Sequence, residues 1–400
     1  MTTSVAVGLS GDSGWILTAA TLVVAGLLLV PGWIVGRAAR LAALPSLAVA
    51  PALSSAIIAA AEILAHTLAL PWLPWGWAVI AGLTAVLALM ARLIVGAPPE
   101  RARRAASPGR AEWAILAAGL TVAVALPAGV ILSVLPSPGY PAQAFDATFH
   151  LNAVAAIREG GNASMLGGLS ALYSGRAVYY PTVWHGVVAL APGSPAPAST
   201  AGVLALTAVV WPLSLLGLFA RATGLDATRA SETDRVHRRQ RTCAVAAVLA
   251  LSAAVVGFPL LPMTALAVWP YALSVAGLPG VLVLYDQLRQ ETASWRLRLT
   301  LVLLTLASAG GVVAAHGTGL FNLAVLSPPF LVNLLVSRWR RCAARRGGRA
   351  LLVAGAVASV LVLVAGAWVM RASLASVLGY QRPAGGVGGI VATLGQALID

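Results

Sequence analysis

The chain has 400 residues, 59% of them hydrophobic and 10% charged, with a formal net charge of +14. Soluble domains carry about 25% charged residues, so this composition excludes an ordinary soluble domain. Continuous runs of Ala, Leu and Val also exclude a membrane β-barrel, whose strands alternate apolar and polar residues. The composition predicts an all-α polytopic membrane protein.

Apolar runs of roughly 20 residues recur along the chain, long enough to cross a bilayer core of about 30 Å. They predict about ten transmembrane helices, at 15–36, 41–65, 75–95, 112–135, 198–220, 242–258, 265–285, 299–316, 319–336 and 350–370. The longest segment without an expected span is 136–197. Within it we expect a helix at 146–159 and an apolar helix at 178–191 that is too short to cross the membrane.

The basic residues are all arginine, and 22 of the 26 fall in loops on one side of the expected bundle. These loops cover 37–40, 92–110, 221–241, 289–298 and 338–349. The positive-inside rule makes them cytoplasmic. We therefore expect a multi-pass plasma-membrane protein with both termini and the loop 136–197 outside. Because the positive charge is divided among these loops, membrane lipids are the expected partners and nucleic acid is not.

Groups able to move a proton gather near the opposite, arginine-poor side. Four of the five histidines lie there, namely His66, His150, His185 and His316. In "FDATFH", Asp146 and His150 are four residues apart, so they share one face of a helix. Each histidine also has an ordinary interpretation as a turn or surface residue. An acid in a first helical turn likewise complements the helix dipole.

Two further patterns near this side stand out. Glu62 and His66 form another pair four residues apart, and a carboxylate inside an apolar span is costly and marks a functional-site hypothesis. "YYPTVWH" places Tyr179, Tyr180 and Trp184 beside His185. Such aromatic residues also occur as a belt at the membrane interface.

A divalent cation is one ligand that this set could hold, since imidazole suits Zn and Mn. Asp146 and His150 are the first candidate ligands. The candidates are spread over four segments without an HExxH pattern, so the residues leave the metal unknown. The sequence has no P-loop and no GxSxG pattern, and a cytoplasmic nucleotide-driven enzyme is not supported.

One stretch carries a family resemblance. "FDATFHLNAVAAIREGG" followed by "YYPTVWHGVVAL", over about 140–190, resembles actinobacterial polytopic membrane proteins of unknown function, and "HGTG" at 316–319 adds to it. That family is similar to the GT-C glycosyltransferases. The resemblance implies N-terminal transmembrane helices at 1–110, a GT-C-like membrane core at 111–370 and an external tail at 371–400.

The implied activity is transfer of a sugar from a polyprenyl-phosphate carrier to an envelope glycan or lipid acceptor, with inversion and without a soluble cofactor. Asp146 is implied as the base, with His150 beside it to orient it or to bind the leaving phosphate. The implied substrate-binding set is Arg158, Arg176, Tyr179, Tyr180, Trp184, His185, His316, Arg371, Glu62 and His66, with the arginines suited to phosphate.

The sequence departs from the GT-C pattern in two ways. Many GT-C enzymes have two adjacent acids, whereas Asp146 is followed by Ala147. The loop also follows the fourth expected span rather than the first. Many relatives are longer, so we interpret the chain as a fragment or a short member.

Two other classes stay open. A transporter or flippase for a lipid-linked or polar substrate would use Glu62 and the external histidines as a proton path. A non-catalytic membrane scaffold would explain the spans alone. Convergence of the four residues Asp146, His150, His185 and His316 on one cavity would favour a site.

Overall fold

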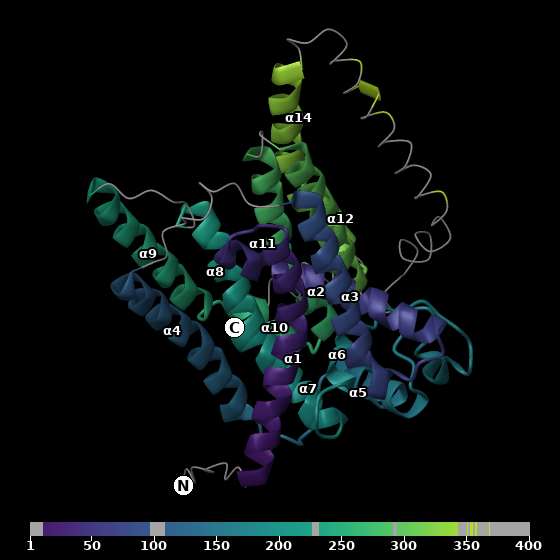
Figure 1. The fold of residues 1–400 in the computed structure, drawn as a ribbon. Coiled ribbons are helices and arrows are strands. Elements are labelled where there is room, and N and C mark those ends of the chain that lie inside the picture. Colours follow the sequence, from purple (N-terminus) through teal and green to yellow (C-terminus); the bar gives the residue numbers. More distant parts are fainter. Residues whose placement is uncertain are drawn as a thin grey trace, which may run out of the picture. The chain divides into compact units, whose positions relative to one another are not determined.

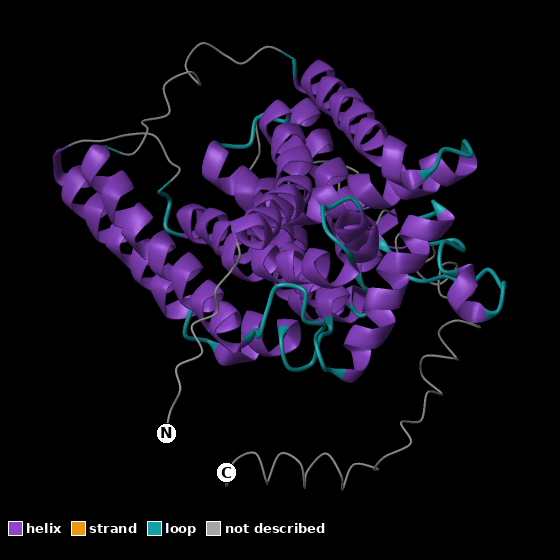
Figure 2. Cartoon of the chain, turned by 90° about the horizontal axis from the view of Figure 1, so that it is seen from below, coloured by secondary structure: helices purple, strands orange, loops and turns teal. Residues whose placement is uncertain are grey.

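The computed structural model describes residues 11–96, 109–225, 232–290 and 294–342, together with 350, 353, 354, 357 and 368. The regular structure of these residues is helical, with no strand among them (Figure 2) and an isolated β-bridge between Leu166 and Tyr179. The chain divides into two units, Met1–Leu331 and Val332–Asp400. All residues of the candidate site lie in the first unit.

Long helices dominate the first unit. They are α1 (Gly11–Ala38), α2 (Ala43–Thr67), α3 (Trp72–Val95), α4 (Arg110–Val134), α9 (Glu232–Ser252), α11 (Trp269–Gln290) and α12 (Trp295–Ala315). The shorter helices are α5 (Phe145–Gly160), α6 (Val183–Ala189), α7 (Pro195–Leu204), α8 (Trp211–Ala222), α10 (Leu261–Met263) and α13 (Gly319–Leu326). A further helix, α14 (Pro328–Cys342), begins in the first unit and continues into the second. A 3₁₀ turn, η2 (Ser170–Tyr173), and two π turns, η3 (Ala205–Val210) and η4 (Val256–Leu260), complete the described elements.

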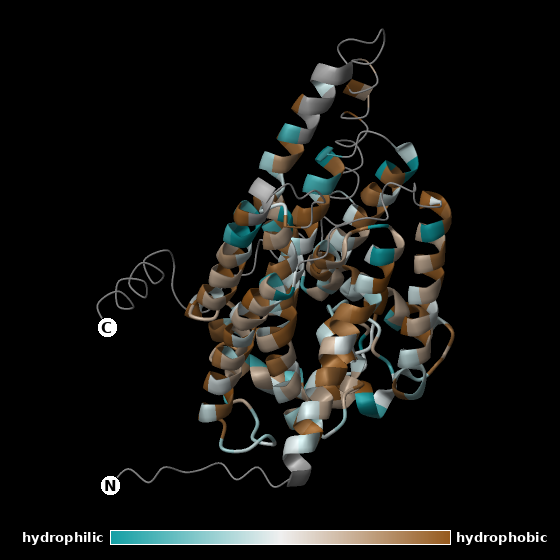
Figure 3. Ribbon diagram, turned by 60° about the vertical axis from the view of Figure 1, so that its left-hand side comes forward, coloured by the Kyte–Doolittle hydropathy of each residue, from teal (hydrophilic) through white to brown (hydrophobic). Residues whose placement is uncertain are grey.

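Seven helices in the described residues are long and apolar enough to cross a membrane, or eight if one bent pair counts as a span. Six of the seven are α1 to α4, α11 and α12, and the seventh is the continuous helix formed by α7, η3 and α8. Hydrophobic residues cover much of the length of these helices (Figure 3). The expectation of an all-α, multi-pass membrane protein is confirmed.

Two expected spans in the C-terminal half differ from the structure, and a third cannot be compared with it. In place of a straight helix at 242–258, α9 is followed by a bend of 52° into 256–263. The expected span 319–336 is divided at Ser327 into α13 and α14, each shorter than a span, because the two prolines that follow Ser327 have no N–H group to continue the helical hydrogen bonds. The expected span 350–370 lies outside the described residues apart from five isolated positions.

A π turn lies inside the span formed by α7, η3 and α8. Pro212 has no N–H to donate to the preceding turn, and its ring crowds that turn. The backbone widens over Ala205–Val210, immediately before this proline, and the helix then continues as α8. The wide turn accommodates the proline without breaking the span.

α2 is the central helix of the unit. It packs against α1, α3, α8, α11 and α12 (Figure 1). Glycines allow the closest approaches: a Cβ on Gly32 of α1 would lie 2.3 Å from the carbonyl oxygen of Ala50, and one on Gly311 of α12 would lie 1.9 Å from that of Ala52. Small residues at helix interfaces permit such packing in membranes. α2, from the expected N-terminal region 1–110, thus forms a common interface with helices of the expected core.

The Gly311 contact leads to a stability prediction. Gly311→Ala places a methyl group against the Ala52 carbonyl, so α12 must shift, and we expect the free energy of unfolding to fall by about 1–3 kcal/mol. Thermal unfolding of the purified protein in detergent measures this. Gly310→Ala is the matched control, since nothing lies within 4 Å of a Cβ at that position. Equal stability of the two variants would contradict the close packing of α2 and α12.

The arginine-bearing helix ends contact one another. Arg40, just after α1, donates a hydrogen bond of 2.5 Å to the carbonyl oxygen of Gly96, just after α3. Arg238 near the start of α9 lies 3.2 Å from the carboxylate of Glu112 near the start of α4, and α4 and α9 run side by side (Figure 1). The helix ends beside the expected arginine-rich loops 37–40, 92–110 and 221–241 therefore share one side of the first unit. We call the opposite side the arginine-poor side.

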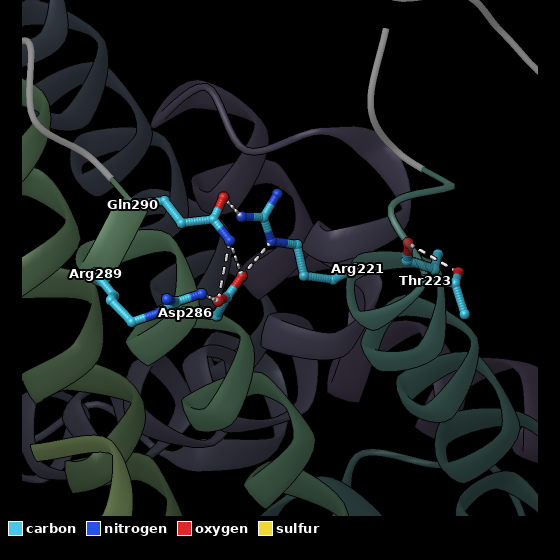
Figure 4. A network of polar contacts seen from close by, with 6 residues as sticks. Arg221, Thr223, Asp286, Arg289 and Gln290 are labelled. Atoms are coloured by element: carbon cyan, nitrogen blue, oxygen red, sulfur yellow. Dashed lines mark hydrogen bonds and ion pairs between the residues drawn. The ribbon is translucent and has the colours of Figure 1, made fainter. Parts of the chain in front are cut away.

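A carboxylate fixes two further helix ends on the arginine-rich side (Figure 4). Asp286 of α11 accepts from Arg221 Nε of α8 at 2.8 Å and from Arg289 Nη2 at 2.9 Å. The side-chain amide of Gln290 donates to both Asp286 oxygens, and its carbonyl accepts from Arg221. These contacts hold α8 to α11 at the end remote from the candidate site.

Candidate functional site

The arginine-poor side is built around α5 and α6, between the spans. α5 begins at Phe145 with Asp146 in its first turn, where a carboxylate complements the positive end of the helix dipole. It ends at Gly160, and the capping residue Gly161 has a φ of 67°, the left-handed conformation that glycine adopts readily. A helix matches the expected 146–159, and α6 is a shorter form of the expected 178–191.

A polar pocket of about 290 Å³ lies at the start of α5. Its lining comes from segments far apart in the sequence: Asp146, Phe149, His150, Tyr173, Tyr180, Val268, Pro270, Tyr271 and His316. Asp146 is the only acid or arginine among these described lining residues. The pocket therefore combines one carboxylate, two imidazoles and several aromatic rings.

Two histidines form a buried pair at the wall of this pocket. Nδ1 of His150 lies 2.9 Å from Nε2 of His185, a hydrogen bond between α5 and α6. His150 is 5% exposed and His185 is fully buried. The His150 ring also packs against Trp269, with 5.4 Å between the ring centroids. The pair thus joins the pocket to the interior of the protein.

Burial keeps these rings uncharged at neutral pH. Burial, together with a smaller repulsive effect of a positively charged His316, lowers the pKa of His150 to about 4. Burial also lowers the pKa of His185 well below its ordinary value, with an added repulsive effect of His150. Loss of hydration disfavours the charged form of an imidazole. Both histidines are therefore neutral hydrogen-bonding groups.

His316 faces the pocket from the end of α12. Its Nδ1 accepts from the backbone N–H of Thr318 at 3.3 Å and lies 2.7 Å from the hydroxyl oxygen of the same residue. Its ring meets that of Tyr271 edge to face, with 5.9 Å between centroids. Burial lowers the pKa of His316. The turn after α12 thus fixes the orientation of this ring.

α6 is held by buried polar contacts to two spans. Thr182, just before α6, donates a hydrogen bond of 3.0 Å to Glu62 Oε2 of α2. The indole N–H of Trp72, the first residue of α3, donates to the carbonyl oxygen of Gly186 at 2.9 Å. A Cβ on Gly186 would lie 2.0 Å from Glu62 Oε1, so glycine makes room for the carboxyl group. These contacts set the position of His185.

Arg158, at the end of α5, binds backbone carbonyl groups of the protein itself. Its guanidinium donates to the carbonyl oxygens of Val188, Ala189 and Ala191, at 3.2, 3.1 and 2.7 Å, and also to that of Gly193. These carbonyls belong to the end of α6 and the turn that follows. Arg158 therefore ties α5 to α6.

An apolar pocket of about 500 Å³ adjoins the polar one. Its lining includes Ile131, Leu135, Leu151, Val203, Met263 and Trp269. Neighbouring residues line the two pockets, since His150 lines the polar pocket and Leu151 lines the apolar pocket. Trp269, which lines the apolar pocket, packs its ring against that of His150. The polar and apolar pockets are thus neighbours, separated by the packed rings of His150 and Trp269.

Comparison with known proteins gives one match. The model of a family of unknown function, DUF6541, matches residues 25–400. The chain belongs to this family. No curated protein and no solved structure matches it.

The structure brings four sequence-predicted residues of the DUF6541 chain together. Asp146, His150, Tyr180 and His316 line the polar pocket, and His185 lies directly behind His150. Three of the four residues whose convergence on one cavity would favour a site, Asp146, His150 and His316, therefore line one pocket, and His185 lies outside its lining. The roles implied for these residues stay predictions.

Other predicted residues lie elsewhere in the DUF6541 chain. Glu62 is buried against Thr182, whereas His66 is exposed near the end of α2. Trp184 is fully buried and packs against Trp269 rather than lying at an interface. Tyr179 and Arg176 are exposed on the loop before α6. The contacts of Arg158 are with backbone carbonyls, and Arg371 lies outside the described residues.

Several pocket residues were absent from the sequence prediction. Tyr173, Tyr271 and Phe149 line the polar pocket, and Trp269 lies at the junction of the two pockets. "WPY" at 269–271 is an aromatic cluster at the start of a span, and it resembles an interfacial belt as closely as a site. Only its packing against α5 distinguishes the two.

The possible metal site can be compared with the geometry. Among the residues described, no group of three or more His, Cys, Asp and Glu side chains is arranged to hold a metal ion. Asp146 and His150 line the same pocket, but His185 covers Nδ1 of His150. The chemistry of the pocket is accordingly argued below from the protein groups.

Proposed function

We propose that this DUF6541 protein is a membrane glycosyltransferase that moves a sugar from a polyprenyl-phosphate carrier to an envelope glycan or lipid acceptor. The observation that carries the proposal is the meeting of two unlike cavities. A polar pocket with one carboxylate and several aromatic rings adjoins a larger apolar pocket at the ends of membrane-spanning helices. A substrate with a polar head and a long apolar chain fits this combination.

Asp146 is the base in this proposal. Polyprenyl phosphate leaves with its negative charge spread over phosphate oxygens, so it needs little help from an acid. The acceptor hydroxyl must lose its proton as it attacks, and a positioned carboxylate can take it. Direct displacement with one base inverts the anomeric carbon and requires no second carboxylate as nucleophile. Asp146 is the single acid among the described residues that line the pocket.

Aromatic rings complete the sugar site. Phe149 and Tyr180 pack together with 5.0 Å between ring centroids, and Tyr271 lines the same pocket with its ring against that of His316. Flat rings present apolar faces, and the hydroxyl of tyrosine adds a donor and an acceptor. Binding sites of this kind use apolar walls with a few placed polar groups.

Arg176 is the proposed partner of the carrier phosphate. Arg158 is already bonded to several carbonyls, whereas Arg176 is exposed on the loop between the pocket residues Tyr173 and Tyr180. A guanidinium matches phosphate oxygens with two parallel hydrogen bonds. By the positive-inside rule, this arginine-poor side is the outer face, where the expected acceptor lies.

A transporter is the second candidate, and one observation favours it. Glu62 is buried in the span α2, and its Oε1 has no hydrogen-bond partner among the described residues. Ionisable groups inside spans often belong to proton paths. Proton-linked flux of a substrate in proteoliposomes, lost in Glu62→Gln and retained in Asp146→Asn, would favour transport over transfer.

A reconstituted assay tests the proposed function. The purified full chain is placed in proteoliposomes with a panel of radiolabelled polyprenyl-phosphate sugars and an envelope lipid extract as acceptor. We expect protein-dependent appearance of label in an acceptor product, with the anomeric configuration inverted. A panel in which no carrier is consumed above the rate of protein-free liposomes would overturn the proposal.

A further inference from the structure

Residues 162–180, which we call the α5–α6 loop, contain two paired extended segments with two unlike faces. Leu166 and Tyr179 oppose each other in an antiparallel bridge, and the N–H of Tyr180 donates to the carbonyl oxygen of Met165 at 3.0 Å. Successive side chains of an extended segment point to opposite faces, and the side chains of bridge partners point to the same face. Met165 and Tyr180 therefore share one face of the loop, and Leu166 and Tyr179 share the other.

The inner face of this loop belongs to the candidate site. Met165 is buried, and the ring of Tyr180 lines the polar pocket. Tyr173, in the 3₁₀ turn η2 of the same loop, lines the pocket as well, and Leu169 just before that turn is buried. Packing against the protein and the pocket thus accounts for the residue types on the inner face.

The other face is apolar and uncovered. Leu166 is 55% exposed and Tyr179 is 58% exposed, and Leu172 and Val178 are exposed in the same loop. The loop contains no Asp or Glu, and its single basic residue is Arg176. Single exposed apolar residues are ordinary, but a group of them on one short segment marks an interaction surface. The outer face of the α5–α6 loop therefore fits an apolar partner.

The start of the loop is attached to the turn between two membrane-spanning helices. The span α2 ends at Thr67 and the span α3 begins at Trp72. The backbone N–H of Trp72 donates to the carbonyl oxygen of Gly161 at 2.7 Å, so the loop begins beside this turn. Exposed apolar residues continue on the turn and on the first turn of α3, namely Leu68, Leu73 and Trp75. Exposed tryptophan is typical of the boundary between lipid and water.

From this placement we propose that the outer face of the α5–α6 loop rests in the outer leaflet of the bilayer. Contact with lipid removes the exposed side chains of Leu166, Leu172, Val178 and Tyr179 from water, as for other segments that lie in the membrane interface. Arg176 then lies at the depth of the lipid phosphates, whose oxygens its guanidinium matches. The absence of an acid from the loop fits this position, because a carboxylate is costly in lipid.

The two faces together connect the pocket with the membrane surface. One loop supplies Tyr173 and Tyr180 to the pocket wall and Leu166 and Tyr179 to the lipid contact. The pocket wall thus stands on the leaflet, and the pocket receives a group that is attached to a membrane lipid at headgroup depth. That this group is the sugar of the carrier rests on the proposed function, but the lipid contact of the loop does not.

A fluorescent label at position 166 tests the lipid contact directly. The full chain has two cysteines, Cys243 and Cys342, and both are replaced by serine. Leu166→Cys is then labelled with a dye whose emission depends on polarity, and the protein is placed in liposomes with lipids brominated at different depths. We expect blue-shifted emission that is quenched most strongly by bromine near the glycerol end of the acyl chains.

Two labelled positions calibrate this measurement. Glu159→Cys reports water on the same side of the protein, because Glu159 is an exposed acid near the end of α5. Val86→Cys reports lipid, because Val86 is 54% exposed on the span α3. A label at 166 that behaves like the label at 159 would overturn the proposal. A label at 166 that is shielded from water but quenched by no brominated lipid would also overturn it, and would indicate a protein on this face.

Leu166→Glu tests the consequence for the site. In the reconstituted assay we expect kcat/KM for a long-chain carrier to fall about three- to tenfold, the scale of one half-exposed leucine withdrawn from lipid. A short-chain, water-soluble carrier should react at the wild-type rate, and an equal fall for both carriers would contradict the role of the leaflet. If the wild-type chain transfers no sugar from either carrier, only the proposed function fails, and the label at 166 still decides the lipid contact.

Discussion

Asp146→Asn is expected to lower sugar transfer by about 10²- to 10⁴-fold, the usual contribution of a general base. Asparagine has nearly the same shape but cannot take a proton from the acceptor hydroxyl. Asp146 is half-buried in the first turn of α5 and lines the polar pocket. The neutral side chain keeps the room for the sugar, so carrier binding should be largely retained while turnover falls.

Glu159→Gln is the matched control for this substitution. Glu159 is an exposed acid on the same helix, near its other end and away from the pocket. The Glu159→Gln substitution removes the same charge, so this variant should transfer sugar at the wild-type rate. Equal rates for both variants would remove Asp146 from the role of base, and thermal unfolding of each variant shows whether the fold is intact.

Trp269→Ala is expected to lower the free energy of unfolding by about 3–5 kcal/mol, as for other buried tryptophans. Trp269 is 2% exposed, and its ring packs against both His150 and Trp184. Its indole N–H donates to the carbonyl oxygen of Met263 at 2.9 Å. Removing the ring also merges the polar and apolar pockets, so the His150–His185 pair should lose its protection from lipid and water.

Two variants calibrate this result. Trp269→Phe keeps a ring between the pockets and loses one hydrogen bond, so we expect a decrease of about 1 kcal/mol. Trp77→Ala removes a tryptophan that is 45% exposed on α3 and should change stability by about 0.5 kcal/mol or less. Denaturant or thermal unfolding in detergent measures the series. A Trp269→Ala protein as stable as Trp77→Ala would contradict the close packing at the junction.

Hydropathy predicted the first four spans because each long apolar run in that region forms one helix, from α1 to α4. It did not predict the bend after α9 or the division at Ser327. The bend and the division depend on prolines and on packing against neighbouring helices, and hydropathy describes neither. The glycines that bring α1 and α12 against α2 are equally hidden, since only the facing backbone shows their role.

The candidate site was partly predictable. The four-residue spacing of Asp146 and His150 predicted that both lie on one face of a helix. The expected position of His185 and His316 on the same side of the bundle suggested that they lie near this face. Sequence could not separate the burial of Trp184 from an interfacial position, or the carbonyl contacts of Arg158 from phosphate binding. Both distinctions depend on the packing of α6, which is fixed by contacts with α2, α3 and α5.

Photo-crosslinking of a carrier tests the central claim most directly. A polyprenyl-phosphate sugar with a photoreactive group on the sugar is irradiated with the full chain in proteoliposomes, and the labelled residues are mapped by mass spectrometry. We predict labels at 145–150, 173–180 and 268–271, competed by unlabelled carrier. Labels confined to other segments, or no competed labelling, would contradict the placement of the transferred sugar in the polar pocket.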